Sequence, residues 1–324
     1  MIRLCVTGGS GFIGTSVVDW AISAGLLVIN FDIKPPKIAS QNKYWKYVDI
    51  RNYSELENAF SDFMPTHILH LAATTGMDVE DIEYFNANTY GVKNLIDASK
   101  VCQSLKRILF TSSLLVCRNG YIPKFETDYC PPNIYGKSKM IGEQFVRESN
   151  MIVSWSIVRP TSVWGPWFEH SYLKFFQIIS RNLYFHIRGV SIVKPQTFVK
   201  NTAYMMQKIL FSNSDAVHKE TFYLADYPEI TTNEWADLIA KNLSKRKKIR
   251  SMPYSLIKLF ALCGDLLKLI GITDPPLTSF RLKNMMTGAA YPISNTREIV
   301  GPLPFSTFEG VSETINWMSK SKLI

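Results

Sequence analysis

The first half of the chain alternates short apolar runs with stretches whose apolar residues recur at helical spacing. The runs predict strands at residues 2–6, 26–31, 44–48, 67–71, 106–110 and 152–158. The stretches predict helices from Phe12 onward and at residues 54–63, 79–102 and 135–148. Such alternation is typical of a parallel sheet with helices on both faces. We therefore predict an α/β protein with a doubly wound parallel sheet of the Rossmann type.

A glycine-rich turn joins the first predicted strand to the first helix. Gly8, Gly11 and Gly14 have the spacing of a turn that passes close to a pyrophosphate and lets the helix pack on the strand. The N–H groups at the start of the helix then face the phosphates. A glycine-rich turn without a ligand would look similar, so the triplet alone predicts a dinucleotide only weakly.

The end of the second predicted strand supports a dinucleotide site. It carries Asp32, about where an acidic residue binds an adenosine ribose. A carboxylate there repels the extra phosphate of NADP. We therefore predict NAD as the cofactor.

The pattern changes after Pro160. The segments become irregular, rich in aromatic residues and interrupted by prolines. This change predicts an NAD-binding Rossmann domain over residues 1–165. A smaller α/β domain over residues 166–324 would mainly bind substrate, and segments of it can return to the first domain.

Composition narrows the class of protein. The chain has 324 residues, and its five cysteines are scattered without close pairs, which indicates reduced thiols in a cytoplasmic protein and no metal site. The net charge of +9 could suit nucleic acid, anionic lipid or anionic small molecules. The dense basic cluster Lys245-Arg246-Lys247-Lys248-Arg250 has no interleaved aromatic residues. We interpret it as a solvated turn and predict no nucleic-acid partner.

Residues 256–272 form a long apolar segment in the second half. Lys258, Asp265 and Lys268 interrupt it, so it predicts an amphipathic helix and no transmembrane segment. We expect this helix to pack on its own domain. Docking on a membrane surface is the alternative.

Two groups of polar residues carry candidate chemistry. Tyr135 and Lys139 lie four positions apart at the start of a predicted helix, so they share a face. A phenol beside a positive charge loses its proton more easily and can act as a base toward an alcohol whose carbon gives up hydride. Thr111-Ser112-Ser113 follows a predicted strand, where a hydroxyl can bind a substrate oxygen. Taken alone, a plain helix face and a Ser/Thr turn explain these two groups as well.

Several motifs together resemble the extended short-chain dehydrogenase/reductase family, the NAD-dependent epimerase/dehydratase group. They follow the family's order over residues 1–170 of the chain. They are Thr7-Gly8-Gly9-Ser10-Gly11-Phe12-Ile13-Gly14, Asp32, Asp49-Ile50-Arg51, His70-Leu71-Ala72-Ala73, Asn88 with Gly91, Thr111-Ser112-Ser113, Tyr135 with Lys139, and Arg159-Pro160-Thr161-Ser162-Val163-Trp164-Gly165-Pro166.

This resemblance implies a role for each catalytic residue. Tyr135 is the expected base, Lys139 lowers its pKa and binds the nicotinamide ribose, and Ser113 holds the reacting oxygen. The cofactor contacts it implies are Gly8, Gly11, Phe12, Ile13, Gly14, Asp32, Asp49, Ile50, Leu71, Ala72, Ala73, Asn88, Ser112, Tyr135, Lys139, Pro160 and Val163. A homodimer is also implied.

The substrate residues that we predict are Thr74, Thr75, Ser113, Ser162 and Arg281. Gln196 replaces an arginine that often contacts the substrate diphosphate in the family, and the Arg281 guanidinium suits phosphate oxygens. A surface arginine remains the alternative for Arg281.

The residues after Ser113 separate the subfamilies. Dehydratases of the family have an Asp-Glu pair there, whereas this chain has Leu114-Leu115, which cannot move the proton that loss of water requires. We therefore predict a nucleotide-sugar epimerase or 4-keto reductase. A 3β-hydroxysteroid or sterol dehydrogenase shares the fold and the Tyr–Lys pair and is the alternative. A noncatalytic NAD-binding sensor is a third reading.

Overall fold

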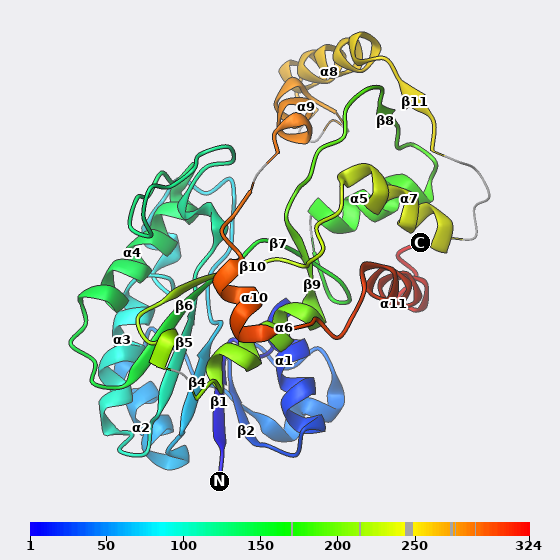
Figure 1. Cartoon of the computed structure of the whole chain (residues 1–324). Helices are drawn as coiled ribbons and strands as arrows, with labels where there is room; N and C mark the ends of the chain where they lie inside the picture. The colour runs from blue at the N-terminus through cyan, green and yellow to red at the C-terminus, as the bar shows by residue number, and fades with distance from the viewer. Residues whose placement is uncertain (170, 214, 244–248, 273–274, 276, 289) are drawn as a thin grey trace. The chain divides into compact units, whose positions relative to one another are not determined.

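A parallel sheet is the centre of the first part of the chain. The computed structural model describes residues 1–169, 171–213, 215–243, 249–272, 275, 277–288 and 290–324. Within these residues a seven-stranded sheet has the order β10-β6-β5-β4-β1-β2-β3 (Figure 1). Its strands are β1 (Arg3–Thr7), β2 (Leu27–Phe31), β3 (Trp45–Lys46), β4 (His67–His70), β5 (Arg107–Thr111), β6 (Ser154–Pro160) and β10 (Thr221–Leu224). All of its strand pairs are parallel, so the predicted doubly wound sheet is confirmed.

The strand order reverses between β1 and β4. Thr7 at the end of β1 pairs in register with Phe31 of β2 on one side and with His70 of β4 on the other. Ligands of doubly wound sheets bind at the carboxyl ends of the strands beside such a reversal. The glycine turn after β1, Asp32 after β2 and Leu71 after β4 therefore lie at the same edge of the sheet.

Helices cover both faces of the sheet. α2, α3 and α4 contact one another in series on one face, and α1 contacts α6 on the other (Figure 1). These helices, with α10 beside α6, are α1 (Phe12–Ser23), α2 (Tyr53–Phe63), α3 (Tyr90–Ala98), α4 (Ile134–Glu148), α6 (Val199–Leu210) and α10 (Ser294–Val300).

The helix predicted over residues 79–102 is wrong in its first half. α3 begins only at Tyr90, and the chain before it forms the short 3-10 helix η2 (Glu83–Phe85). The Asn88 side chain bonds to the main chain of Thr74 on both its donor and its acceptor side. Thr89, the N-cap of α3, has a φ of −112° and a ψ of −88°, which lie outside the helical region. The helix therefore starts after Asn88.

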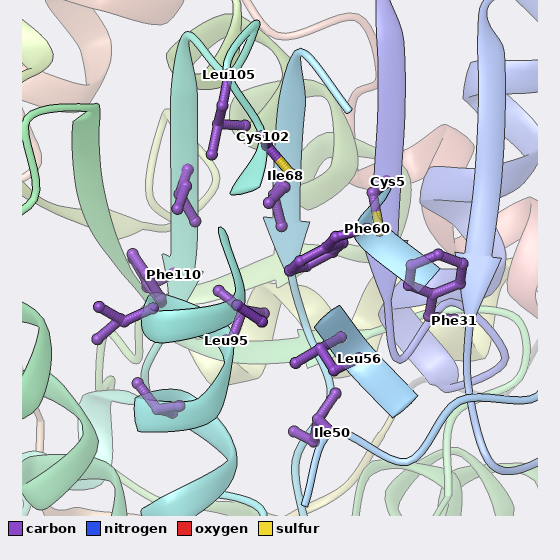
Figure 2. Packing of buried hydrophobic residues seen from close by; sticks show 14 of the residues in the cluster. Cys5, Phe31, Ile50, Leu56, Phe60, Ile68, Leu95, Cys102, Leu105 and Phe110 are labelled. Atoms are coloured by element: carbon purple, nitrogen blue, oxygen red, sulfur yellow. The ribbon is translucent and has the colours of Figure 1, made fainter. Parts of the chain in front are cut away.

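An apolar core fills the space between the sheet and helices α2 and α3. Figure 2 shows Cys5 and Ile68 from neighbouring strands facing Phe60 of α2 and Leu95 of α3. All four side chains are fully buried. Alternating apolar residues on the strands and helical spacing on α2 and α3 direct these side chains into one layer.

The described chain divides into two units. The first consists of Met1–Trp167, Gln196–Ala225 and Pro292–Phe305, and the second of Phe168–Pro195, Asp226–Tyr291 and Ser306–Ile324. Two later segments thus belong to the first unit, and one of them supplies β10. The same segment, Gln196–Ala225, also contains β9 (Gln196–Phe198), which pairs with β7 (Ser162–Trp164).

The second unit is built around helix α7. Its capping box of Thr231 and Glu234 fixes its start, and Trp235 on it packs against the rings of Phe175 and Phe176 of α5. Helix α11 also contacts α7. The elements of this unit are α5 (Ser171–Ser180), β8 (His186–Ile187), α7 (Thr232–Asn242), β11 (Ser251–Met252), α8 (Tyr254–Leu269), α9 (Ser279–Met286) and α11 (Thr307–Lys320).

Part of the predicted basic cluster lies outside the described residues. Lys245, Arg246, Lys247 and Lys248 fall outside the description, whereas Arg250 is described and directly precedes β11. The remaining short 3-10 helices are η1 (Ala39–Tyr44), η3 (Ser99–Val101), η4 (Leu114–Val116) and η5 (Asp215–Val217).

Replacing Phe60 by Ala should lower the free energy of unfolding by about 3–5 kcal/mol, because it leaves a cavity in the core of the first unit. Denaturant unfolding followed by circular dichroism measures this. Phe125→Ala is the matched control, since Phe125 is exposed, and it should change stability little. Equal losses for the two variants would contradict the assigned core.

Candidate functional site

The glycine turn lies directly after β1 and presses against β4. Gly8 has a φ of 75°, and a Cβ at this position would overlap the backbone of Ala72. Its amide also donates to the Phe31 carbonyl oxygen at 2.8 Å. Only glycine combines this left-handed conformation with such a close approach. The turn is therefore fixed between the ends of β2 and β4.

The first turn of α1 continues from this loop. Gly11 is the N-cap of α1, and Phe12, Ile13 and Gly14 form its first turn. This helix end has neither a side-chain cap nor an acidic residue. An anion such as a pyrophosphate suits an N-terminus of this kind, because the helix dipole is positive there.

Asp32 lies beside the turn. Its carboxylate accepts hydrogen bonds from the Ser10 amide at 3.0 Å and from the Lys34 amide at 2.9 Å. Burial raises the pKa of Asp32, and these backbone hydrogen bonds oppose the rise. The carboxylate is thus held next to the glycine turn, as a ligand of an adenosine ribose requires.

Asp49 and Ile50 follow β3. Both carboxylate oxygens of Asp49 accept hydrogen bonds from Arg51, with a closest distance of 2.6 Å to Nη2. These bonds lower the pKa of Asp49. Ile50 is buried, and a Cβ at Gly91 on α3 would meet its side chain. The sequence motif thus forms a short ion pair above a buried isoleucine.

Asn88 ties the chain after β4 to helix α4. Its side chain donates to the Thr74 carbonyl oxygen at 2.9 Å and to Ser138 Oγ at 2.9 Å, and it accepts from the Thr74 amide at 2.8 Å. The segment Leu71, Ala72, Ala73, Thr74 and Thr75 runs from the end of β4 through this clamp. The geometry therefore gives Asn88 a positioning role toward the predicted cofactor and substrate contacts.

Ser113 and Tyr135 meet at the carboxyl end of β5. Ser113 Oγ accepts a hydrogen bond from the Leu115 amide at 3.1 Å, and the Ser113 hydroxyl is close enough to Tyr135 to lower the pKa of the phenol. The Leu115 carbonyl presses on the start of α4, since a Cβ at Gly136 would overlap its oxygen. Asn133 caps this helix by accepting from the Gly136 amide at 2.8 Å. These contacts fix the phenol beside the serine.

Lys139 lies one helical turn further along α4 and is buried. Its Nζ donates to the Thr111 carbonyl oxygen at 2.7 Å. Burial lowers the pKa of Lys139 to about 8, and the charge of Glu143 opposes this. The ammonium is therefore mainly protonated at neutral pH.

The pKa of Tyr135 is shifted by its own surroundings. Burial raises it above the ordinary 10.0, and the hydrogen bond with Ser113 lowers it in part. Ser113 can donate its proton to the phenol oxygen because its own oxygen accepts from Leu115. The serine therefore favours the phenolate form that a base requires.

Glu143 is paired with a fully buried arginine. Arg159 on β6 donates to it through Nε at 2.8 Å and Nη2 at 2.7 Å, and the side chains of Arg159 and Glu143 are 1% and 2% exposed. Burial lowers the pKa of Arg159, but the hydrogen bonds and charge of Glu143 outweigh this and raise it. The fork of Arg159 thus holds Glu143 in place on the helix that carries Lys139.

A small cavity of about 20 Å³ lies behind Lys139. Thr111 Oγ1, Ser112 Oγ and His70 Nε2 belong to residues that line it, and these three buried atoms have no hydrogen-bond partner in the described part of the chain. His70 Nδ1 is bonded to Thr7 Oγ1 at 2.7 Å. A cavity of this volume has room for about one water molecule, which could hydrogen-bond to these atoms.

The predicted residues around the end of β6 lie in β6 itself and in the short strand β7 of the first unit. Pro160 ends β6 and is buried, and Ser162 and Val163 belong to β7. Ser162 pairs in register with Gln196 of β9, the residue that replaces an arginine of the family. Arg281 lies in the second unit on α9, where its guanidinium donates to the Pro275 carbonyl oxygen.

Comparison with known proteins identifies the family. The description "NAD dependent epimerase/dehydratase family" matches residues 4–193. The chain belongs to this family. The predicted resemblance is thereby confirmed, the chain is an NAD-dependent enzyme, and its cofactor is NAD. The glycine turn with Asp32 fits that cofactor.

Two relatives that match most of the chain carry names of different activities. N-acetyl-alpha-D-glucosaminyl-diphospho-ditrans,octacis-undecaprenol 4-epimerase of Escherichia coli O157:H7 is 24% identical, and the match covers 97% of this chain and 95% of the relative. 3 beta-hydroxysteroid dehydrogenase/Delta 5-->4-isomerase of monkeypox virus is 25% identical over 91% of this chain and 90% of the relative.

Solved structures share the fold. UDP-glucose 4-epimerase of Thermotoga maritima, solved with UDP-glucose, has a TM-score of 0.72 at 21% identity, and the match covers 99% of this chain and 100% of that chain. At this identity the similarity extends to the fold alone.

Sequence reasoning missed several residues that shape the site. No motif of the sequence marks Glu143, and Arg159 belongs only to the motif of residues 159–166. The close approach at Gly136 involves Leu115 of η4, which belongs to a different segment of the chain. A glutamate four residues after Lys139 on the same helix was the one available signal.

Replacing Asp32 by Ala should weaken NAD binding about tenfold and reduce discrimination against NADP, because it removes a hydrogen-bond acceptor and a negative charge near the ribose. Calorimetric titration with both cofactors measures this. Asp19→Ala is the matched control, since Asp19 is an exposed carboxylate on α1. A parent protein that already binds NADP more tightly than NAD would contradict the role of Asp32.

The apoprotein should lose stability as the pH falls below about 6.5, because burial lowers the pKa of His70 from 6.5 to about 3. Between these values the unfolded chain binds a proton that the folded chain does not, so acid favours unfolding. His70→Gln should reduce the slope of unfolding free energy against pH by about 1.4 kcal/mol per unit. Denaturant titrations at several pH values measure it, and equal slopes would contradict the assignment.

Proposed function

We propose that the chain is an epimerase that inverts a hydroxyl-bearing carbon of a sugar carried on a diphosphate, with Tyr135 as the base. The observation that carries this proposal is that the turn of Ser113 lies against the start of α4, which carries Tyr135 and the buried Lys139. NAD, when bound, accepts hydride from the substrate carbon and returns it. Each residue then has a separate task toward the substrate hydroxyl.

Tyr135 takes the hydroxyl proton as the carbon is oxidised and gives it back when the keto group is reduced. When substrate is bound, the one hydroxyl proton of Ser113 turns from the phenol to the substrate oxygen and holds that oxygen beside the phenol. Lys139 keeps a positive charge next to this proton exchange, and Glu143 helps to keep that charge. Inversion requires the keto intermediate to rotate before reduction on its other face.

The turn after Ser113 favours simple redox chemistry over dehydration. η4 places Leu114, Leu115 and Val116 directly after the serine, and none of these side chains can accept or donate a proton. Epimerisation and 4-keto reduction both proceed without a further acid or base. We favour epimerisation because the Escherichia coli relative, matched over nearly the whole chain, is named a 4-epimerase.

The substrate that we propose is a sugar joined through a diphosphate to a nucleoside or to a lipid alcohol. The Thermotoga maritima structure contains UDP-glucose, and the name of the Escherichia coli relative describes a sugar diphosphate on undecaprenol. We propose that the first unit holds NAD and that residues 166–324 mainly bind substrate, with Thr74, Thr75, Ser162 and Arg281 as further contacts. We also propose that the protein is a cytoplasmic homodimer. Its five free cysteines support the cytoplasm as its compartment, because thiols stay reduced there.

A 3β-hydroxysteroid dehydrogenase is the second candidate. The viral relative carries that name and matches 91% of the chain. Such an enzyme would change the nicotinamide absorbance stoichiometrically, whereas an epimerase turns over without net change. Incubation with UDP-, GDP- and dTDP-sugars, a polyprenyl diphosphate sugar and a 3β-hydroxysteroid, followed by mass spectrometry and absorbance, separates the two.

Replacing Tyr135 by Phe should reduce turnover by about 10²–10⁴-fold while NAD binding stays nearly unchanged, because only the proton-transferring hydroxyl is lost. Product formation and calorimetric NAD titration measure the two effects. Tyr90→Phe is the matched control, since Tyr90 is exposed on α3. Undiminished turnover by Tyr135→Phe would refute the proposed mechanism.

A further inference from the structure

Cys117 and Cys130 lie in register on two segments of the first unit. The Arg118 amide donates to the Cys130 carbonyl oxygen at 2.8 Å, and the Cys130 amide donates to the Val116 carbonyl oxygen at 3.0 Å. These bonds make an isolated parallel bridge between the two cysteines. Residues paired in this way turn their side chains to the same face, and the backbones of such neighbours lie about 4.7–4.9 Å apart. A disulfide allows a Cα···Cα distance of about 4.4–6.8 Å, so the backbone has the separation that a disulfide requires.

The Cys117 side chain points toward the segment of Cys130. Its Sγ donates to the Asp128 carbonyl oxygen at 3.3 Å. Burial raises the pKa of the Cys117 thiol, and the charges of Cys130 and Asp128 raise it further, whereas the Cys130 main chain and the Arg159 charge oppose the rise. The Cys117 sulfur is thus close to Cys130. A guanidinium nearby also favours the thiolate, which is the form that enters disulfide exchange.

The two cysteines differ in their access to solvent. Cys130 is half-buried, whereas Cys117 is 2% exposed. An oxidant in solution therefore reaches Cys130 first. Cys5 and Cys102 are also near each other, but both are buried in the core of the first unit, as Figure 2 shows. Cys117 and Cys130 thus combine closeness with access, and the core pair does not.

We propose that Cys117 and Cys130 are a modification site, where a small disulfide such as oxidised glutathione converts them into a reversible disulfide. The Cys130 thiolate attacks one sulfur of the oxidant, breaks its S–S bond and displaces one glutathione. The Cys117 thiolate then attacks the Cys130 sulfur and displaces the second glutathione. Together the two cysteines lose two electrons and two protons, and the oxidant takes these up as two thiols. Reduced glutathione runs both steps in reverse.

The disulfide would join the two segments that lead to the predicted catalytic residues. Cys117 directly follows η4, which starts after Ser113, and Cys130 lies shortly before Asn133, the N-cap of α4. A disulfide with one partly exposed sulfur belongs to the labile kind that a pool of thiols can reduce. The proposal concerns the thiols alone and does not depend on the proposed sugar chemistry, so disulfide formation and turnover can fail separately.

Peptide mapping tests the proposal on the full chain with NAD. The protein is incubated with oxidised glutathione, unfolded in excess N-ethylmaleimide to block the remaining thiols, and digested with trypsin without reduction. Cleavage after Arg118 and Lys124 puts the two cysteines on separate peptides, residues 108–118 and 125–137. Mass spectrometry should find these peptides linked, at a mass two hydrogens below their sum, and reduced glutathione should separate them.

Single variants check both steps. Cys117→Ser and Cys130→Ser should each abolish the linked peptide. Without Cys117 the intermediate cannot go further, so Cys130 should keep one glutathione, whereas without Cys130 the buried Cys117 should stay reduced. Cys263→Ser is the matched control, since Cys263 is an exposed thiol in the second unit, and it should leave the linked peptide unchanged. Unchanged circular dichroism and NAD affinity show that the variants fold.

The parent protein decides the outcome. Absence of the linked peptide overturns the proposal, and glutathione on Cys263 in the same digest shows that the oxidant reacted. A disulfide from Cys130 to any other cysteine also overturns it. Non-reducing electrophoresis should show a monomer, and a covalent dimer that carries the linked peptide would contradict a disulfide within one chain.

Discussion

The burial of Lys139 is the constraint on which the predicted catalytic centre depends. A buried ammonium is unfavourable unless it is paired and hydrogen-bonded. Here the Thr111 carbonyl oxygen accepts a hydrogen bond from Lys139 Nζ at 2.7 Å. Glu143 supplies a negative charge one turn away on the same helix. Glu143 is in turn held by the two-pronged contact of Arg159. Strands β5 and β6 and helix α4 are thus joined by one buried electrostatic network.

The position of this network follows from the fold. Parallel strands bring the end of β5, which carries Thr111 and Ser113, to the same edge as the glycine turn after β1. Close backbone contacts then set the fine geometry, because the Leu115 carbonyl lies against Gly136 and Asn88 bridges the end of β4 and Ser138. The residues proposed to hold NAD and those proposed to exchange the proton therefore lie at one edge of the sheet.

Local patterns predicted the features that depend on neighbouring residues. The glycine turn, Asp32 and the first six sheet strands were visible because spacing and apolar runs are properties of one segment. The pairing of Arg159 with Glu143 joins segments 16 positions apart through the sheet, so spacing did not indicate it. Strand β10 is only Thr221–Leu224 and lies in an irregular stretch. The sequence also did not indicate which side of α8 is exposed, because apolar spacing does not tell which apolar side a helix buries. In the described residues no helix is long and apolar enough to span a bilayer.

The most direct test of the account uses a sugar diphosphate substrate that carries deuterium on the carbon that is inverted. Mass spectrometry and NMR of the product determine both its configuration and its label. If hydride leaves this carbon and returns to its other face, the product is inverted and keeps the deuterium. An inverted product in which solvent hydrogen has replaced the deuterium would contradict hydride transfer at this site.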